Sequence, residues 1–397
     1  MKWEERLQAQ MPQNKLASAG MMCTYCDLGP CVINPFDEEP RVGACGIDAE
    51  NMNMVNLALK VMKGLSDYTI ELPETISLSL ETMMGPHHTT GITIQSLLEA
   101  SRPILKASEE RVSAWHIDEQ KPRDIEQGVG VLQRDAVNIV LTTYEPEMIK
   151  TSRSQKMRKL AQDNGAQKIN LVGALCGGTE AAYAHGIPLL GGTDQLEEAQ
   201  HMIDFIYESG DCVQACEQAV ENFTSRDKAQ FVPTATTRVR VGYPIDTEAI
   251  NAALKKGVIN GVVGLMGCHY GKSTWDTDEL VQTLADSDIM VINLSYDLKH
   301  AEPGPESSAL FSEYGIPLVL NGGCCEPGKF LGIDSLTVLI PTWGDPRLLT
   351  AAFAFASEGI PVILGTMPFV IPAVKNQLVE AGVTIESDSS RIMDLLR

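Results

Sequence analysis

Apolar positions recur at helical spacing within the first 130 residues, whereas the rest of the chain alternates between short apolar runs and amphipathic stretches. The clearest helical repeat consists of Met52, Val55, Leu59 and Met62. The pattern predicts helices over residues 49–64, 76–98 and 104–115. Pro103, Pro122 and the charged run 118–124 indicate that the helical part ends near residue 130.

After residue 130 the first apolar runs are rich in β-branched residues. They predict strands at 137–141 and 168–173 and a weaker strand at 187–190. Helices are expected between and after them, at 147–164 and 195–222. Short apolar strands that alternate with helices are typical of a parallel sheet covered on both faces. Residues 231–243, with Pro233 and several threonines, are expected to form a linker.

The last part of the chain repeats the alternation without an obvious sequence repeat. Helices are expected at 247–256 and 277–286, and strands at 258–265, 289–294, 317–321, 336–341 and 361–365. The predicted fold class is therefore α/β. It consists of a helical domain over residues 1–130, followed by two Rossmann-like parallel-sheet domains over residues 131–235 and 236–397.

Charge and composition narrow the classes of function. The 397 residues include 31 Lys and Arg against 52 Asp and Glu, a net charge of −21, which repels phosphate backbones and argues against nucleic-acid binding. No run of about eighteen apolar residues predicts a membrane span. The first residues, from Met1 to Arg6, lack the apolar core of a secretory signal. We expect a cytoplasmic protein, and its ten cysteines favour reduced thiols and metal ligation over disulfides.

Four cysteines lie within 23 residues near the N-terminus, at steps of three, five and fourteen. They are Cys23, Cys26, Cys31 and Cys45. Gly29 and Pro30 can turn the chain toward the third cysteine, and Gly43 allows backbone to approach the fourth closely. Cluster sulfur atoms accept hydrogen bonds from such nearby N–H groups. The spacing favours a [4Fe–4S] cubane in the helical domain, with a four-cysteine zinc site or a disulfide knot as the alternatives.

Other cysteines follow predicted strands, which is where open α/β sheets place their binding sites. Cys176 follows the second strand, Cys268 follows the 258–265 strand, and Cys324 and Cys325 follow the 317–321 strand. Cys212 and Cys216 lie near a helix. We expect a second metal cluster between the two α/β domains. The alternative is that these cysteines are buried thiols without a metal.

The cysteine segments occur in an order that resembles the anaerobic nickel–iron carbon monoxide dehydrogenases. The segments that carry this resemblance are residues 22–31 with 43–46, 171–180, 263–268, 321–326 and 359–368. The resemblance extends from about residue 22 to 372. Hybrid-cluster proteins share the architecture but have a glutamate where Cys176 stands, so the dehydrogenase branch of this superfamily is closer.

The resemblance implies that Cys176, Cys268 and Cys324 are ligands of the second cluster, together with either Cys212 or Cys216. It also exposes several departures from the family pattern. Tyr144 stands where the family has a ligand histidine, and the segment 293–296, which includes Ser295, lacks a ligand cysteine. Arg347 replaces a catalytic lysine, and residues 66–68 replace a proton-relay histidine segment. The helical domain is short, and no cysteine before Cys23 could bind a cluster shared by two subunits.

The candidate catalytic residues are Arg347, His269 and Glu326. Arg347 could stabilise an anion, but it is a poor proton donor because it stays protonated. His269, Tyr144 and Glu326 could supply further metal ligands. Alternatively, they form hydrogen bonds around the site or pack within the fold.

The resemblance and the departures together predict an iron–sulfur oxidoreductase that acts on a small molecule at a modified second cluster, without stoichiometric nickel. Ordinary oxidation of CO is not expected. The alternatives are a non-catalytic electron-transfer or cluster-assembly protein, and a reductase of the hydroxylamine reductase type. A homodimer and a ferredoxin-like electron carrier are the expected partners.

Overall fold

The computed structural model describes residues 3–25, 28–34, 41–68, 92–114, 121–231, 234–267, 273–295, 308–366 and 370–396. The chain divides into two compact units. Unit 1 comprises Met1–Arg6, His116–Asn260 and Val281–Cys325, and unit 2 comprises Leu7–Trp115, Gly261–Leu280 and Glu326–Arg397. The domain boundaries predicted at residues 130 and 235 stay a prediction.

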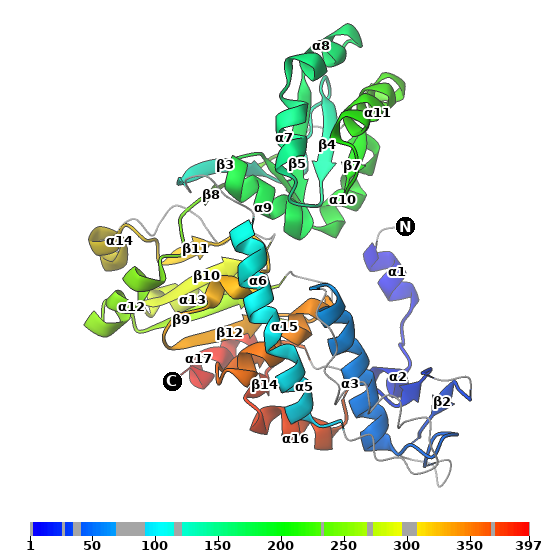
Figure 1. The fold of residues 1–397 in the computed structure, drawn as a ribbon, viewed down its shortest axis with the longest axis vertical. Helices are drawn as coiled ribbons and strands as arrows, with labels where there is room; N and C mark the ends of the chain where they lie inside the picture. Colours follow the sequence, from blue (N-terminus) through cyan, green and yellow to red (C-terminus); the bar gives the residue numbers. More distant parts are fainter. Residues whose placement is uncertain are drawn as a thin grey trace. The chain divides into compact units, whose positions relative to one another are not determined.

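Four helices of unit 2 pack against one another (Figure 1). They are α3 (Ala49–Ser66), α5 (Ile94–Ser101), α6 (Pro103–Ala114) and α15 (Pro346–Ser357). The helices predicted at 49–64 and 104–115 are confirmed in their described parts, and α3 runs two residues further than expected. Most of the helix predicted at 76–98 lies outside the described residues. Asp48 caps α3 by accepting the backbone N–H of Asn51, and the buried face of α3 includes Met52, Val55 and Val61.

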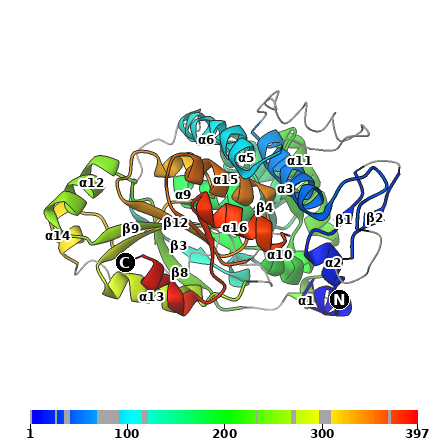
Figure 2. The same ribbon diagram turned by 90° about the horizontal axis from the view of Figure 1, so that it is seen from below.

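The N-terminal segment contributes α1 (Trp3–Ala9), α2 (Lys15–Ser18) and a small two-stranded sheet. Its strands are β1 (Met22–Cys23) and β2 (Cys31–Val32), which pair antiparallel. In Figure 2 α2 lies beside this sheet.

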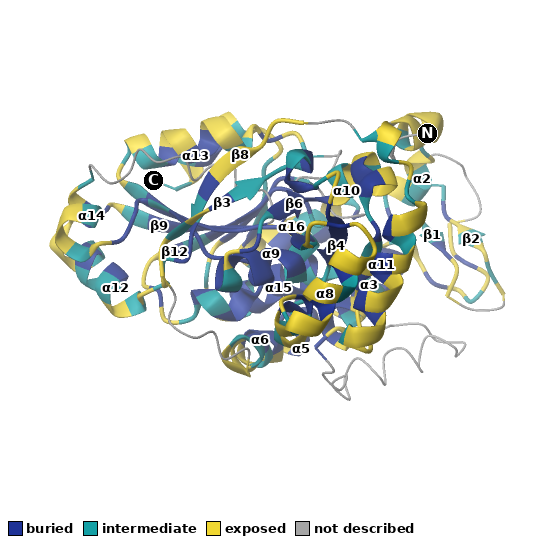
Figure 3. Ribbon diagram, turned by 90° about the horizontal axis from the view of Figure 1, so that it is seen from above, coloured by how far each residue is buried: buried dark blue, intermediate teal, exposed yellow. Residues whose placement is uncertain are grey.

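The first large sheet belongs to unit 1 and has the strand order β7-β4-β5-β6-β3-β8. The strands are β3 (Arg123–Gln127), β4 (Val137–Leu141), β5 (Ile169–Ala174), β6 (Leu189–Gly191), β7 (Phe205–Tyr207) and β8 (Thr237–Val241). All neighbouring strands are parallel except β3 and β8. Every residue of β4 is buried, as expected for a central strand covered on both faces (Figure 3).

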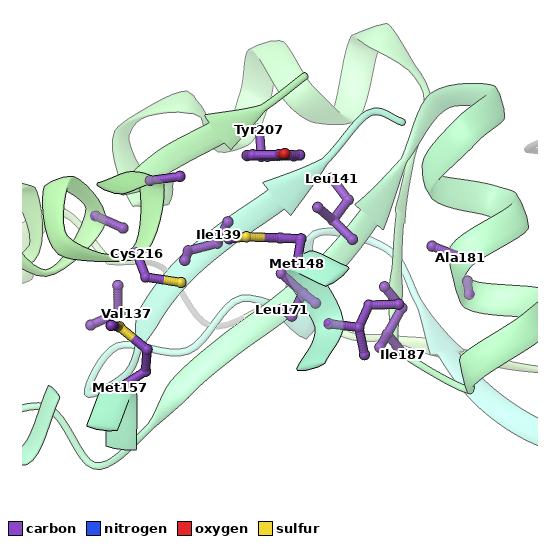
Figure 4. Packing of buried hydrophobic residues seen from close by; sticks show 14 of the residues in the cluster. Val137, Ile139, Leu141, Met148, Met157, Leu171, Ala181, Ile187, Tyr207 and Cys216 are labelled. Carbon is purple, nitrogen blue, oxygen red and sulfur yellow. The ribbon is translucent and has the colours of Figure 1, made fainter. Parts of the chain in front are cut away.

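Two hydrophobic cores cover the two faces of this sheet. Val137, Ile139 and Leu141 enter one core, and Val140 enters the other, as the two-residue period of a strand requires. The first core is closed by α7 (Pro146–Ser152), α8 (Gln155–Asp163), α9 (Leu175–His185) and α11 (Cys212–Ser225) (Figure 4). The second is closed by η1 (Val129–Val131), α10 (Thr193–Ala199) and η2 (Gln200–Met202).

Two of the helices predicted for unit 1 are wrong in part. The helix expected at 147–164 is broken into α7 and α8, because the Ser154 side chain caps α8 by accepting the N–H of Met157. The helix expected at 195–222 contains strand β7, whose three residues pair with β4. Glycine and a capping aspartate, Gly210 and Asp211, separate this strand from α11.

The linker expected at 231–243 is wrong over Thr237–Val241, which forms strand β8. Its partner β3 includes residues from the charged run that was expected to end the helical part. The pairing places Asp124 opposite Arg240 and Glu126 opposite Arg238. Opposite charges on facing strands stabilise a sheet edge, but each strand by itself has little apolar pattern.

The second large sheet has the strand order β11-β10-β9-β12-β13-β14. In unit 2 the strands β9 (Gly261–Met266), β12 (Leu336–Ile340), β13 (Val362–Leu364) and β14 (Val383–Ile385) are parallel. In unit 1, β10 (Ile289–Leu294) pairs in parallel with β11 (Val319–Asn321). The associated helices are α12 (Thr247–Lys256), α13 (Thr277–Asp286), α14 (Ala309–Tyr314), α16 (Pro372–Glu380) and α17 (Ile392–Leu395).

All five strands predicted in the last part of the chain are present, and α12 and α13 match the predicted bounds. Strand β14 was not expected. The predicted α/β class with parallel-sheet domains is confirmed. Within the described residues, no helix combines the length and the apolar character that crossing a membrane would require.

Candidate metal centres

The N-terminal cysteines are organised by the small sheet of unit 2. Cys23 on β1 lies directly opposite Cys31 on β2, and the Gly29–Pro30 peptide bond in the connection between them is cis. Directly opposed residues of an antiparallel pair project to the same face, with Cβ atoms about 5 Å apart. Two of the four predicted ligands therefore share one face of the sheet. Cys26 lies outside the described residues.

The segment before Cys45 wraps over Cys31. The backbone N–H of Ala44 donates a hydrogen bond to the Cys31 Sγ atom at 3.3 Å. A Cβ atom on Gly43 would lie 2.8 Å from the Ile47 side chain and 3.6 Å from the Cys31 sulfur, so only glycine fits there without displacement. An N–H group directed at a cysteine sulfur is the arrangement that stabilises a cluster-bound thiolate. The local structure therefore fits an iron–sulfur cluster.

Two asparagine side chains of helix α3 donate hydrogen bonds to the backbone that precedes Cys23. Asn56 donates to the backbone carbonyls of Gly20 and Met22, at 3.0 and 2.8 Å, and Asn53 donates to that of Gly20 at 3.0 Å. Asn53 is fully buried. Because these amides satisfy carbonyl groups just before Cys23, they fix where β1 begins.

In unit 1, Cys176 stands at a sharp turn from strand to helix. Strand β5 ends at Ala174, Leu175 adopts a left-handed backbone with φ 56°, and Cys176 is the second residue of α9. A Cβ atom on Gly177 would lie 2.4 Å from the Cα atom of Thr143, so α9 starts in direct contact with the end of β4. Cys176 is half-buried at the carboxyl edge of the sheet.

The loop after β11 is tied to the same helix. The backbone N–H of Cys324 donates to the Glu180 Oε2 atom at 3.0 Å, and both residues are buried. Glu180 follows Cys176 by one helical turn, so both lie on one side of α9. The neighbouring Cys325 is half-buried, and its thiol donates to the carbonyl of Leu294 at 2.9 Å. Unit 1 thus brings together α9, the end of β10 and the loop that carries Cys324 and Cys325, here called the dicysteine loop.

Cys212 and Cys216 have different surroundings on α11. Cys216 is fully buried in the first core, among Val137, Ile139 and Met157 (Figure 4). Burial, with smaller contributions from Cys212 and Glu217, raises the pKa of the Cys216 thiol to about 12. Cys212 is the half-buried first residue of the helix, and its sulfur lies 3.4 Å from the Tyr207 hydroxyl. The surroundings of Cys216 match the alternative of a buried thiol without a metal.

Tyr144 lies beside a histidine that the sequence reasoning did not single out. The Tyr144 hydroxyl is 3.3 Å from the His185 Nε2 atom, and the two rings stack with centroids 5.8 Å apart. His185 is the last residue of α9, so this helix carries an imidazole at one end and Cys176 at the other.

The Glu326 carboxylate contacts three side chains of unit 2. Its side chain is buried, and its Oε2 atom accepts hydrogen bonds from the hydroxyls of Ser108 at 2.7 Å and Tyr68 at 3.3 Å. Its Oε1 atom lies 3.2 Å from the Arg111 guanidinium, which also stacks over the Tyr68 ring. Burial, and secondarily the negative charge of Glu326, raises the pKa of Tyr68. These contacts join the segment after the dicysteine to α6 and to the end of α3.

Arg347 is also engaged in ion pairs in unit 2. Its guanidinium donates to one oxygen of Asp345 at 2.9 and 2.5 Å and lies 3.5 Å from an oxygen of Asp67. Nearby, the Lys60 ammonium lies 5.0 Å above the Trp343 ring, and burial, with Lys63 second, lowers the pKa of Lys60. The predicted site residues Cys268 and His269 lie outside the described residues.

Sequence reasoning missed Glu180, His185, Ser108, Arg111 and Lys60. The spacing of four residues between Cys176 and Glu180 on a helix could have indicated the first of them. Glu326, the partner that Ser108 and Arg111 share, is more than two hundred residues away in the chain, so no local pattern points to this contact. Among the described residues, no three His, Cys, Asp or Glu side chains are arranged to hold a single metal ion. None of the eight described cysteines forms a disulfide.

The fold and the thiols define an α/β protein with a cysteine-rich N-terminal segment and further cysteines at the ends of its parallel strands. Comparison with known proteins identifies the family. The sequence matches the model of the Prismane/CO dehydrogenase family over residues 21–116 and 196–328, more than half of the chain. The chain belongs to this family.

Relatives and solved structures are consistent with that assignment. Carbon monoxide dehydrogenase 1 of Methanosarcina acetivorans is 22% identical, in an alignment that covers 96% of this chain and 88% of the relative. The alignment spans 561 positions, more than the 397 residues of this chain, so the relative has segments that this chain lacks. The chain is a divergent, shortened member related to carbon monoxide dehydrogenases.

The fold agrees with two solved structures, each 18% identical in sequence. A nickel-free carbon monoxide dehydrogenase from Thermococcus sp. AM4 has a TM-score of 0.78, with 100% of this chain and 93% of that chain covered. A structure of acetyl-CoA synthase/carbon monoxide dehydrogenase, described by its nickel–zinc and nickel–nickel iron–sulfur clusters, has a TM-score of 0.81, with 100% and 89% covered.

Proposed function

We propose that the chain is an iron–sulfur oxidoreductase that acts on a small molecule at a modified second cluster. The observation that carries this proposal is the assembly in unit 1, where Glu180 ties the Cys324 loop to the helix that presents Cys176. Membership of the Prismane/CO dehydrogenase family supports redox chemistry at a metal centre beside Cys176 and Cys324. A ferredoxin-like carrier is the expected electron partner.

Cys23, Cys26, Cys31 and Cys45 would hold a [4Fe–4S] cubane, which when bound carries single electrons. The support comes from the register of Cys23 with Cys31 and from the Ala44 N–H group directed at the Cys31 sulfur. Asn53 and Asn56 act on the backbone before Cys23 and keep the sheet in place for the ligands.

Cys176, Cys268, Cys324 and Cys212 would hold the second cluster, which when bound offers a metal coordination position to a small molecule. We choose Cys212 over Cys216 because the core encloses Cys216, and this burial raises the pKa of its thiol. The Glu180 carboxylate would orient the Cys324 backbone. Tyr144 pairs with His185 at the opposite end of α9 from Cys176, so we assign neither residue a contact with the bound molecule.

Oxidation of CO at the rate of the relatives is not expected. Tyr144 and Ser295 replace a nitrogen ligand and a thiolate that the family resemblance implies, so the ligand set suits nickel poorly. Arg347 does not replace the proton donor, because its guanidinium stays protonated and its charge is balanced by Asp345 and Asp67. Glu326 would act within unit 2, by binding Ser108, Tyr68 and Arg111.

The test is a count of iron, sulfide and nickel per chain in strictly anaerobic protein, followed by a viologen-coupled CO oxidation assay after nickel supply. We expect iron and sulfide for two clusters, less than stoichiometric nickel and no rapid turnover. Robust CO turnover that is lost in Cys268→Ala would contradict the proposal. An iron content that accounts for only one cluster would show that the second cluster does not form.

A non-catalytic electron-transfer or cluster-assembly role is the second candidate. It is favoured by the ion pairs of Arg347 and Glu326, which engage both described candidate catalytic side chains. Two clusters that exchange electrons with a ferredoxin but bind no small ligand such as CO, cyanide or hydroxylamine would support this role. A ligand-induced change in the spectrum of the second cluster would support the enzyme.

A further inference from the structure

We infer that Cys325, together with Cys324, is a thiolate ligand of the second cluster at the carboxyl end of β10. This inference rests on the proposed function and adds a residue to its ligand set. The sequence places Cys325 after a predicted strand, but the family resemblance does not include it among the cluster ligands. The contact between its thiol and strand β10 indicates this role.

Two adjacent parallel strands of unit 1 place Cys325. The register pairs Asn293 of β10 with Asn321 of β11, and the backbone N–H of Gly322 donates to the Asn293 carbonyl at 2.9 Å. The loop after β11 therefore leaves the sheet directly beside the end of β10. There the Cys325 thiol reaches the Leu294 carbonyl at 2.9 Å, next to Ser295. A sulfur atom is thus present at the strand end where the sequence itself has a serine.

Cys324 fixes the other side of the loop. Its N–H group is held at 3.0 Å by Glu180, and the buried Gly322 packs against the Leu294 side chain. The loop is consequently attached to α9 at one residue and to β10 at the next. Cys176, one turn before Glu180, lies on the same side of α9. Cys176 therefore lies on α9, and Cys324 and Cys325 lie on the loop after β11. One hydrogen bond links this loop to α9 and another links it to β10. All of these elements belong to unit 1.

The chemistry of the thiol agrees with this role. In the structure Cys325 donates its proton to a carbonyl and is half-buried, so it is accessible to an incoming metal. Binding replaces the S–H bond with an iron–thiolate bond and releases one proton to solvent. The Leu294 carbonyl then loses one hydrogen bond, which water can replace because the site is only half-buried.

Two substitutions separate the ligand role from the hydrogen bond. Cys325→Ser keeps a hydroxyl that can donate to the Leu294 carbonyl but removes the thiolate, and Cys325→Ala removes both. The third variant, Cys325→Ala with Ser295→Cys, returns a thiol to the end of β10 from the neighbouring residue. Cys216→Ala is the matched control, because it removes a thiol that the core encloses.

Each protein is purified anaerobically and reconstituted with ferrous iron and sulfide. Iron and sulfide per chain and the Mössbauer spectrum are the readouts, and circular dichroism confirms folding. We expect Cys325→Ser and Cys325→Ala to lose about half of the iron. The double variant should regain most of it, and the control should match the unmodified chain.

Three outcomes would overturn the inference or the proposal beneath it. Iron at the unmodified level in Cys325→Ser, with loss only in Cys325→Ala, would show that the hydrogen bond alone matters. If the iron content and the Mössbauer spectra of Cys325→Ser and Cys325→Ala both match those of the unmodified chain, Cys325 is not a ligand of the cluster. Iron for one cluster in the unmodified chain would instead refute the second cluster of the proposed function, and Cys325 as its ligand with it.

Discussion

Cys31 and Cys216 show how two thiols of one chain come to differ in chemistry. Cys31 is half-buried, faces Cys23 across two strands, and accepts an N–H hydrogen bond at its sulfur. Cys216 is enclosed by aliphatic side chains, and burial disfavours its thiolate. A metal ligand must lose its proton, so the first environment favours ligation and the second opposes it.

We therefore predict opposite results for two single substitutions. Cys31→Ser should lower the iron content by about half, because one cubane ligand is lost. Cys216→Ala should leave the iron content unchanged and reduce the free energy of unfolding by about 1 kcal/mol, because it removes packing in the core. Iron analysis and urea unfolding of both variants check this. Undiminished iron in Cys31→Ser would disprove the first cluster.

At the scale of elements, a buried ion pair fastens the end of α11 to the start of the first sheet. Arg226, the residue after α11, donates to Asp204 at 2.7 Å and to the backbone carbonyls of Arg134 and Ala136. Asp204 also accepts the backbone N–H of Asn138, the second residue of β4. Burial raises the pKa of Asp204 to about 6 and outweighs the opposing effects of this N–H and of Arg226. Burial also lowers the pKa of Arg226.

The raised pKa predicts how stability depends on pH. The carboxyl group binds its proton more tightly when folded, so its contribution to stability is complete below its ordinary pKa of 3.8 and is lost as pH rises through about 6. From pH 4 to 7 the unmodified chain should lose up to about 3 kcal/mol relative to Asp204→Asn, which does not titrate. At pH 7 the variant should be at least as stable as the unmodified chain, because its neutral amide avoids the cost of burying an ionised carboxylate, which outweighs the attraction of Arg226.

Urea unfolding of both proteins across this pH range measures the difference between their slopes. Equal slopes, or a smaller loss in the unmodified chain, would mean that the attraction of Arg226 outweighs burial.

At the scale of the whole molecule, exposed apolar side chains concentrate near the first cluster segment. Five large hydrophobic residues that are at least 38% exposed lie between positions 11 and 42: Met11, Tyr25, Leu28, Val32 and Val42. Several exposed apolar side chains on one segment make this segment a candidate for a contact with another protein. Because most symmetric assemblies are dimers, we propose that a second copy of the chain covers it.

The dimer prediction can be tested by placing a charge on this segment. Leu28→Glu together with Val42→Glu should convert a dimer into a monomer, because a buried unpaired carboxylate is costly. Val379→Glu is the matched control, since Val379 is 47% exposed and Val42 is 48% exposed. Light scattering of iron-loaded protein gives the mass. An unmodified chain that is monomeric with its iron intact would refute the prediction.

Local patterns predicted the elements whose cause is local. Val137–Leu141 and Ile289–Leu294 were found with their bounds because a buried parallel strand must be apolar on both faces. Strands β3 and β8 were missed because they are stabilised by charges that meet only across the pair. The short strand β7 was hidden in a helical pattern for a similar reason, since its pairing with β4 decides its structure.

The α/β class and the family resemblance could be recognised from the sequence, and the first four cysteines could be proposed as ligands, because each of these depends on the spacing of residues within short stretches of the chain. Only the tertiary structure decided that Cys216 belongs to the core, that Glu326 and Arg347 are held in ion pairs, and that Cys325 reaches the end of β10. Glu180 and Cys324 are 144 residues apart in the sequence. Their hydrogen bond exists because two different elements fold to the same edge, which no local pattern encodes.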